Sequence, residues 1–239
     1  MCIRDRFTVE AGRPDTITRE KLQVLKNWGI DRISINPQSM RDEVLAAIGR
    51  RHTSEAVAEA VELARSAGMG HINMDLIAGL PADSAEGFRY TVDRVLALSP
   101  ESITIHTLSL KKGTKITLEN TKRPGGDEVR DMLDYGGRAL RMAGYGPYYL
   151  YRQKYTSGGF ENVGWSKKGY ESLYNILIME ELCSILSMGG GGSTKLVAAK
   201  QGKIQRIFNP KYPYEYIEGI EKVIKGKEGI RKFYETEVF

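Results

Sequence analysis

Apolar positions along the first 144 residues follow two spacings in turn. Short segments rich in β-branched residues, such as 32–36, alternate with segments whose apolar residues recur at helical spacing, such as 54–67. Asp83 with Glu86 forms a capping-box pair before one helical segment. The pattern predicts strands at 7–11, 32–36, 71–77 and 102–109, and helices at 18–28, 42–48, 54–67, 83–96 and 127–143. Four alternations of strand and helix predict a parallel α/β sheet, either open and doubly wound or closed as a barrel.

The chain changes character after Gly144. The next twenty residues are rich in Tyr and Gly, and the apolar segments 173–179 and 182–188 are predicted to be short buried strands. Four consecutive glycines occupy 189–192, and apolar residues at helical spacing predict a helix over 213–225. We therefore expect the α/β part to cover 7–144 and a smaller α+β accessory region to cover 145–239.

Composition narrows the class of protein. The chain has 239 residues, of which 41% are hydrophobic and 27% charged, and this balance excludes global disorder. No apolar run approaches the roughly 18 residues that predict a membrane span. The net charge of +5 is spread along the chain, so it suits an anionic small molecule at least as well as a nucleic acid, and we expect no nucleic-acid partner. Without a signal-peptide pattern, the expected compartment is the cytoplasm.

The two cysteines, Cys2 and Cys183, are too few for a disulfide scaffold or a Cys-rich metal site. Cys183 is expected to be an inert buried thiol in an apolar strand. Among the histidines, His71 is expected to be structural, His106 to face the interior of a barrel, and His52 to lie on the surface. The chain shows no Ser/His/Asp triad and no metal-ligand spacing of histidines.

Polar residues follow the predicted strands at the ends where ligands bind in parallel α/β folds. Carboxylates bind amines and ribose hydroxyls, and arginine pairs with carboxylates, so together these residues suit a zwitterionic, ribose-bearing ligand. Each residue taken alone is more simply a polar side chain where a strand reaches the surface, but the series favours a site. The candidates are Glu10, Gln38, Arg50, Asp75 and Ser109.

Two further features have alternative interpretations. The glycine run 189–192 either cradles a ligand or forms a flexible turn, and neither the Walker nor the Rossmann spacing is met. Arg152 and Lys154 belong to a tyrosine-rich cluster at 145–155. This segment either pairs with a planar polyanion or forms a packed aromatic edge.

Several strings resemble radical S-adenosylmethionine (SAM) enzymes of the oxygen-independent coproporphyrinogen III oxidase group, in its coproporphyrinogen dehydrogenase branch. The most specific is NMDLIAGLP at 73–81, and IGRRH at 48–52 and YYLYRQK at 148–154 support it. The resemblance implies a partial (β/α)6 barrel that binds SAM across its strand ends and acts on a tetrapyrrole. It implies SAM contacts at Glu10, Gln38, Arg50 and Asp75, a mainly backbone contact at Ser109, and substrate contacts at Arg152, Lys154, Gly190 and Gly191.

Members of this family hold a [4Fe–4S] cluster through a CxxxCxxC loop, a motif that is absent from this sequence. The resemblance therefore implies that the loop lies upstream of Phe7 in a full-length protein, and that 1–6 are a non-native leader. The full-length protein is expected to convert two propionates of coproporphyrinogen III to vinyl groups in haem biosynthesis, with an electron donor and acceptor as partners. The fragment alone is expected to be inactive. The alternatives are a haem-binding chaperone of the same family or a SAM-binding module without a cluster.

Overall fold

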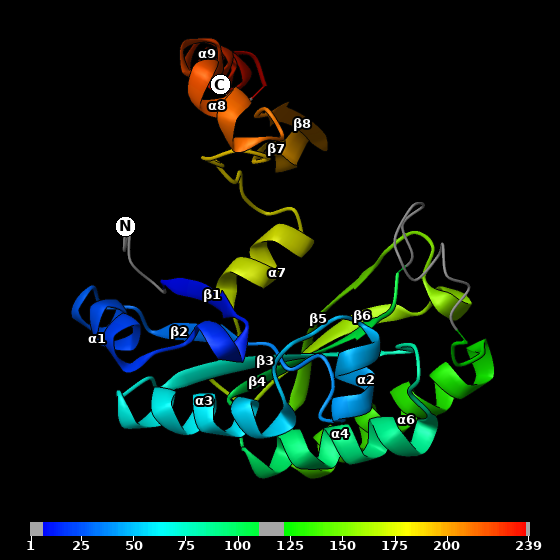
Figure 1. Ribbon diagram of the computed structural model, residues 1–239. Coiled ribbons are helices and arrows are strands. Elements are labelled where there is room, and N and C mark those ends of the chain that lie inside the picture. The colour runs from blue at the N-terminus through cyan, green and yellow to red at the C-terminus, as the bar shows by residue number, and fades with distance from the viewer. Residues whose placement is uncertain (1–6, 110–121, 238–239) are drawn as a thin grey trace. The chain divides into compact units, whose positions relative to one another are not determined.

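A computed structural model describes residues 7–109 and 122–237 (Figure 1). The contacts within the chain divide it into two compact units, unit 1 through Glu171 and unit 2 from Ser172 onward. This division differs from the boundary expected after Gly144, because the Tyr-rich segment that follows belongs to the sheet of unit 1. Among the described residues, no helix is long and apolar enough to cross a membrane.

Unit 1 is built on a six-stranded sheet in the order β1-β2-β3-β4-β6-β5. The first four strands are parallel, as the alternating pattern predicts, and helices connect them. The strands are β1 (Thr8–Gly12), β2 (Arg32–Ile35), β3 (His71–Ala78), β4 (Ser102–Thr107), β5 (Gly146–Arg152) and β6 (Glu161–Ser166), and the helices are α1 (Arg19–Asn27), α2 (Asp42–Ala47), α3 (Ser54–Ser66), α4 (Ala85–Ala97) and α6 (Gly126–Met142).

Side-chain caps start three of these helices. The Thr18 hydroxyl accepts a hydrogen bond from Lys21 N at the start of α1, as expected for an N-cap residue. At α4 the cap is Ser84, whose Oγ accepts from Gly87 N at 3.1 Å. The expected capping role of Asp83 is therefore wrong by one residue. Asp83 Oδ1 instead accepts from Ser84 N at 2.9 Å, in the turn before the helix.

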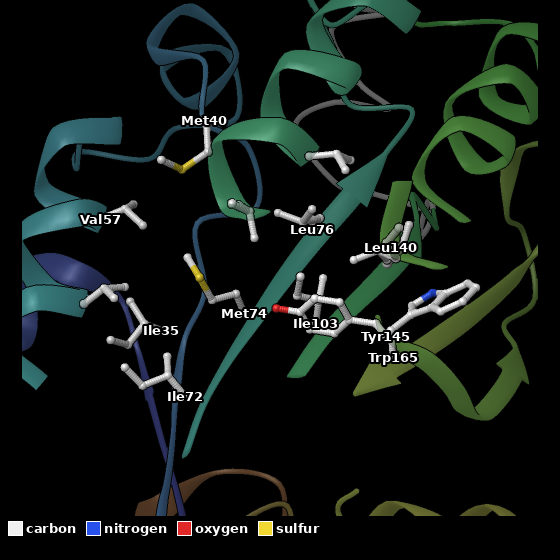
Figure 2. Packing of buried hydrophobic residues seen from close by; sticks show 14 of the residues in the cluster. Ile35, Met40, Val57, Ile72, Met74, Leu76, Ile103, Leu140, Tyr145 and Trp165 are labelled. Carbon is white, nitrogen blue, oxygen red and sulfur yellow. The ribbon is translucent and has the colours of Figure 1, made fainter. Parts of the chain in front are cut away.

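The core of unit 1 lies between one face of the sheet and helices α3, α4 and α6, which run along that face (Figure 1). Successive side chains on a strand point to opposite faces, so every second strand residue enters this core. Ile72, Met74 and Leu76 of β3 do so, and they are almost fully buried (Figure 2). The residues between them are polar and lie on the other face, and this opposite face is where the candidate site is found.

Strands β5 and β6 form a hairpin that extends the sheet. β6 pairs antiparallel with β4, and β5 pairs antiparallel with β6, so β5 runs in the same direction as β4. Trp165 of β6 is buried in the core of unit 1 beside α6, where the Arg141 guanidinium lies over its ring. Burial of this indole explains why the segment belongs to the sheet and not to a separate accessory region.

Unit 2 contains a two-stranded hairpin packed with a long helix. Its core is formed by Leu196, Ala198 and Phe233. The predicted helix over 213–225 is present as two helices, with Gly219 between them. The elements of unit 2 are α7 (Leu173–Met179), β7 (Ser193–Ala198), β8 (Lys203–Phe208), α8 (Pro213–Glu218) and α9 (Ile220–Glu237). In the described part of the chain, single-turn 3₁₀ segments occur at Pro14–Thr16 and Ser157–Gly159 in unit 1 and at Ala199–Gln201 in unit 2.

Two predicted strands of unit 2 are wrong. The segment 173–179 is the helix α7, and 182–188 is irregular apart from a bridge between Ile185 and Lys195. Each segment has seven mostly apolar residues, and so short a run shows too little periodicity to distinguish a helix from a strand. Cys183 is accordingly neither in a strand nor fully buried, contrary to expectation.

Candidate functional site

The face of the unit 1 sheet that points away from the helices α3, α4 and α6 carries polar side chains, where buried strands usually carry apolar ones. Asn73 and Asp75 of β3 lie beside Ser102 and Thr104 of β4, in register pairs Asn73↔Ser102 and Asp75↔Thr104. His106 of β4 pairs with Ile77, two register positions further toward the carboxyl ends of the strands. Burying such a row of polar side chains in an apolar core would be unfavourable. The row therefore indicates that this face of the sheet lines a site for a polar ligand.

Asp75 is the centre of this arrangement. Its side chain retains 21% exposure, its Oδ1 accepts a hydrogen bond from Asn73 Nδ2 at 2.9 Å, and His106 Nε2 lies 3.7 Å from its Oδ2. Burial alone would raise the pKa of Asp75, but interactions with His106, Asn73 and Thr104 outweigh it and lower the pKa below its usual value. The site therefore presents an ionised carboxylate at neutral pH.

Polar contacts continue toward the amino ends of the strands. Ser102 Oγ donates to Asn73 Oδ1 at 3.0 Å and lies 3.0 Å from His71 Nε2, and Arg32 Nε approaches the same His71 nitrogen at 3.3 Å. His71 is buried within this set, as expected for a structural histidine. These contacts fix the side chain of Asn73, which in turn holds Asp75.

Two tyrosines of β5 reach across β6 to β4. The hydroxyls of Tyr149 and Thr104 lie 3.2 Å apart, and the Tyr151 hydroxyl lies 3.3 Å from His106 Nδ1. The two rings are parallel, with centroids 6.3 Å apart. Burial raises the pKa of both tyrosines, so both phenols are protonated at neutral pH. The crossing is possible because β6 has no side chain at Gly164, where a Cβ would lie 1.8 Å from the Tyr149 ring.

Replacing Gly164 by alanine is expected to displace Tyr149 and to lower the free energy of unfolding by about 1–3 kcal/mol, since the new methyl group has no space. Urea unfolding measures the change. Gly146→Ala is the matched control, because Gly146 lies in the same sheet with nothing within 4 Å of the added Cβ. Equal stability losses in the two variants would contradict the proposed crowding at Gly164.

The predicted strand-end residues lie as follows. Gln38 follows β2 in a left-handed conformation with φ of 68°, and its backbone pairs with β3: its N–H donates to Asp75 O, and its O accepts from Ile77 N, both at 3.0 Å. This pairing brings Gln38 and Asp75 together. Glu10 is an exposed residue of β1, and Arg50 is half-buried after α2, where its N donates to Leu45 O. Their roles remain predictions.

Two further residues with sequence-based predictions, Ser109 and His52, lie near the strand ends. Ser109 Oγ donates to Lys154 O at 2.8 Å, which ties the end of the β4 segment to the loop after β5. His52 was expected on the surface, but it is buried, with Nε2 3.4 Å from Pro37 O. Burial lowers the pKa of its imidazole, which favours the neutral form.

The predicted substrate residues are less organised. Arg152 is exposed and forms an ion pair with Glu161 across the β5–β6 hairpin, and Lys154 is exposed. In unit 2, Gly191 N donates to Pro210 O, and a Cβ on Gly190 would lie 3.3 Å from Pro213. The glycine run is therefore a turn packed against 210–213, and the Gly191 donor is already used within the chain.

The described ranges 7–109 and 122–237 contain no cluster of three His, Cys, Asp or Glu side chains that could hold a metal ion. Cys183 is the one cysteine within these ranges, in unit 2, and Cys2 lies outside them. The part of the chain that the structure describes therefore fits a polar organic ligand at Asp75 and does not supply thiolates for a metal centre.

Asn73, Ser102 and Thr104 were missed as site residues by the strand-end rule. Their signal in the sequence is the alternation of polar and apolar residues within β3 and β4, in strands that a parallel sheet usually makes apolar on both faces. A polar residue at every second position of such a strand indicates that one face of the sheet lines a site for a polar ligand.

Comparisons with known proteins agree on one family. The sequence profile of the Radical SAM superfamily matches residues 3–95. The oxygen-independent coproporphyrinogen-III oxidase-like protein HemZ of Bacillus subtilis is 50% identical over 217 residues, which are 90% of this chain and 43% of that protein. The heme chaperone HemW of Haemophilus influenzae is 30% identical over 213 residues, 89% of this chain and 52% of that protein.

A solved structure shares the fold. The coproporphyrinogen III oxidase HemN of Escherichia coli, a radical SAM enzyme, superimposes with a TM-score of 0.68 and 19% sequence identity, over 91% of this chain and 49% of that one. This chain thus spans about half the length of the proteins it matches. The match supports the radical SAM fold for the parallel sheet and its helices.

Proposed function

We propose that this chain, which belongs to the radical SAM superfamily and to its coproporphyrinogen III oxidase-like group, forms the SAM-binding part of an oxygen-independent coproporphyrinogen III oxidase. Proteins of this family use SAM and a [4Fe–4S] cluster, which together supply the oxidant that removes a hydrogen atom from the substrate. Because the described residues do not supply cluster thiolates, the cluster ligands are expected in another part of the full-length protein.

The observation that supports SAM binding is the ionised, partly exposed carboxylate of Asp75 on a polar sheet face. A carboxylate has about four acceptor positions, and the hydroxyls of a ribose can use those that the protein leaves free. In this proposal Asp75 accepts hydrogen bonds from the ribose, and Gln38 and the backbone near Ser109 line the same strand ends. Glu10 binds the SAM amine, and Arg50 pairs with the SAM carboxylate.

The proposed reaction converts a propionate side chain to a vinyl group. One hydrogen atom leaves the β-carbon, one electron passes to an acceptor, and the C–C bond to the carboxylate breaks to release CO2. The support for this reaction is the 50% identity to the oxidase-like HemZ. For the carboxylates of the substrate, Arg152 and Lys154 of unit 1 are the proposed partners.

The test is an anaerobic assay of the whole protein that carries this chain, with coproporphyrinogen III, SAM and a low-potential reductant. The expected products are 5′-deoxyadenosine, CO2 and protoporphyrinogen. Formation of 5′-deoxyadenosine without decarboxylation would keep the SAM site and exclude this substrate. An Arg152→Ala variant is expected to bind coproporphyrinogen more weakly, and unchanged affinity would exclude that residue as a substrate contact.

A second candidate is a haem chaperone, and the observation that favours it is the 30% identity to HemW over most of the chain. This function predicts tight binding of haem without conversion of coproporphyrinogen. The same protein sample can therefore be titrated with haem and followed by its Soret absorbance. Tight haem binding together with an absence of decarboxylation would favour the chaperone.

A further inference from the structure

The position of the Asp75 carboxylate depends on a histidine that the sequence pattern did not connect with it. One carboxylate oxygen is held by Asn73 Nδ2 at 2.9 Å, and the other faces His106 Nε2 at 3.7 Å, within ion-pair distance. His106 lies on the neighbouring strand, two register pairs beyond Asp75, and therefore on the same face of the sheet. The carboxylate is thus flanked on both oxygens by side chains of its own sheet.

Tyr151 contacts the other ring nitrogen of His106, Nδ1. Its hydroxyl lies 3.3 Å from His106 Nδ1. In a neutral imidazole, a phenol that donates to Nδ1 leaves the proton on Nε2, and in an imidazolium both nitrogens carry protons. Because burial raises the pKa of Tyr151, the phenol keeps its proton. The ionised Asp75 carboxylate opposite Nε2 favours a proton on that nitrogen, and the Tyr151 phenol can then donate to Nδ1, so the two neighbours together favour an Nε2–H that faces Asp75.

Tyr151 is itself held in place. Its ring is parallel to that of Tyr149, whose hydroxyl is 3.2 Å from Thr104 Oγ1. The rings of Tyr151 and His106 meet edge to face, with centroids 6.3 Å apart. Residues from β3, β4 and β5 thus form one connected set across the polar face, and this set ends at the carboxylate.

We propose that His106 is a positioning residue, oriented by Tyr151, that turns the Asp75 carboxylate so that its free lone pairs face the ribose hydroxyls of SAM. This inference rests on the proposed function, because it requires SAM at Asp75. Residues that fix the rotamer of a binding group reduce the entropy that is lost when the ligand binds. Their loss lowers the binding affinity without removing any direct contact to the ligand.

The test is equilibrium binding of SAM, by anaerobic calorimetry, to the whole protein with its cluster unreduced so that no turnover occurs. His106→Phe keeps an aromatic ring at this position and removes both ring nitrogens, and we expect about tenfold weaker SAM binding, because the Asp75 carboxylate loses the group that faces its Oδ2 and must be ordered on binding. His106→Gln keeps an N–H donor and is expected to bind within about threefold of the wild type. Tyr151→Phe removes one oxygen atom and is expected to fall between them, and Tyr155→Phe, at a tyrosine with 74% exposure, is the control.

A double-variant experiment in the Asp75→Asn background distinguishes a positioning role of His106 from a merely structural one. If His106 acts through Asp75, then adding His106→Phe to Asp75→Asn causes no further loss of SAM affinity. A loss that persists in full in that background, or wild-type affinity in both His106→Phe and Tyr151→Phe, would overturn the positioning role. Unchanged SAM affinity in Asp75→Asn itself would overturn the proposed SAM site. If His106→Phe does not fold, the coupling is measured with Tyr151→Phe in its place.

Discussion

Replacing Phe88 by alanine is expected to lower the free energy of unfolding by about 3–5 kcal/mol, the largest stability effect that we predict in this chain. Phe88 is completely buried on α4 and packs in the core of unit 1. Its ring lies within 3.5 Å of the position a Cβ would take on Gly136 of α6, so it fills the space where the two helices approach. A close-packed interior relaxes only partly around such a deletion, and a cavity remains.

Urea unfolding followed by circular dichroism measures this loss. Tyr90→Ala is the matched control, because Tyr90 is an aromatic residue of the same helix with 50% exposure, and its loss is expected to change the free energy of unfolding far less. A Phe88→Ala variant that is no less stable than Tyr90→Ala would show that α4 does not pack on the sheet as described.

Replacing Asp75 by asparagine is expected to weaken SAM binding about 10- to 100-fold, since hydrogen bonds to a charged acceptor contribute about 1.5–3 kcal/mol. The rate of 5′-deoxyadenosine formation at low SAM concentration is expected to fall by a similar factor. Calorimetric titration with SAM and a product assay measure the two effects. Asp127→Asn serves as the control, because the Asp127 side chain is 98% exposed.

The same substitution has a pH signature. The pKa of Asp75 in the folded protein lies below the usual value of 3.8, so its ionised form stabilises the fold above that pH, and this stabilisation is lost as the pH falls through the folded-state pKa. The stability of Asp75→Asn is therefore expected to fall less steeply than that of the wild type as the solution is acidified below about pH 4. Parallel acid-unfolding curves would contradict the lowered pKa.

The parallel part of the fold follows from local signals in the sequence. Strand and helix periods, together with the caps at Thr18 and the stops at Gly29 and Gly68, place β1 to β4 and their helices. The β5–β6 hairpin was expected outside the sheet, because the burial that attaches it depends on Trp165 meeting α6, a contact between distant residues. The segment 173–179 is too short and has too few polar residues to distinguish a helix from a strand by its periodicity.

The candidate site likewise has residues that the sequence predicts and residues whose role depends on the folded structure. The rule that ligands bind at the carboxyl ends of parallel strands selects Gln38 and Asp75, and the structure joins the backbones of these two residues by a hydrogen bond. The groups that hold Asp75 depend on register, because His106 meets it only through the offset between β3 and β4. His52 was placed on the surface by its charged neighbours, whereas its burial results from packing beside Pro37.

The strand order β4-β6-β5 also determines how this part of the protein opens and refolds. Among the described strands, β5 pairs with β6 alone, so breaking the β4–β6 ladder releases both strands together. Such an event is a local unfolding with its own free energy, below that of global unfolding, and it separates Tyr149 and Tyr151 from β4. Amide hydrogens of β5 and β6 are accordingly expected to exchange as one cooperative group, through the same opening event that separates Tyr149 and Tyr151 from β4.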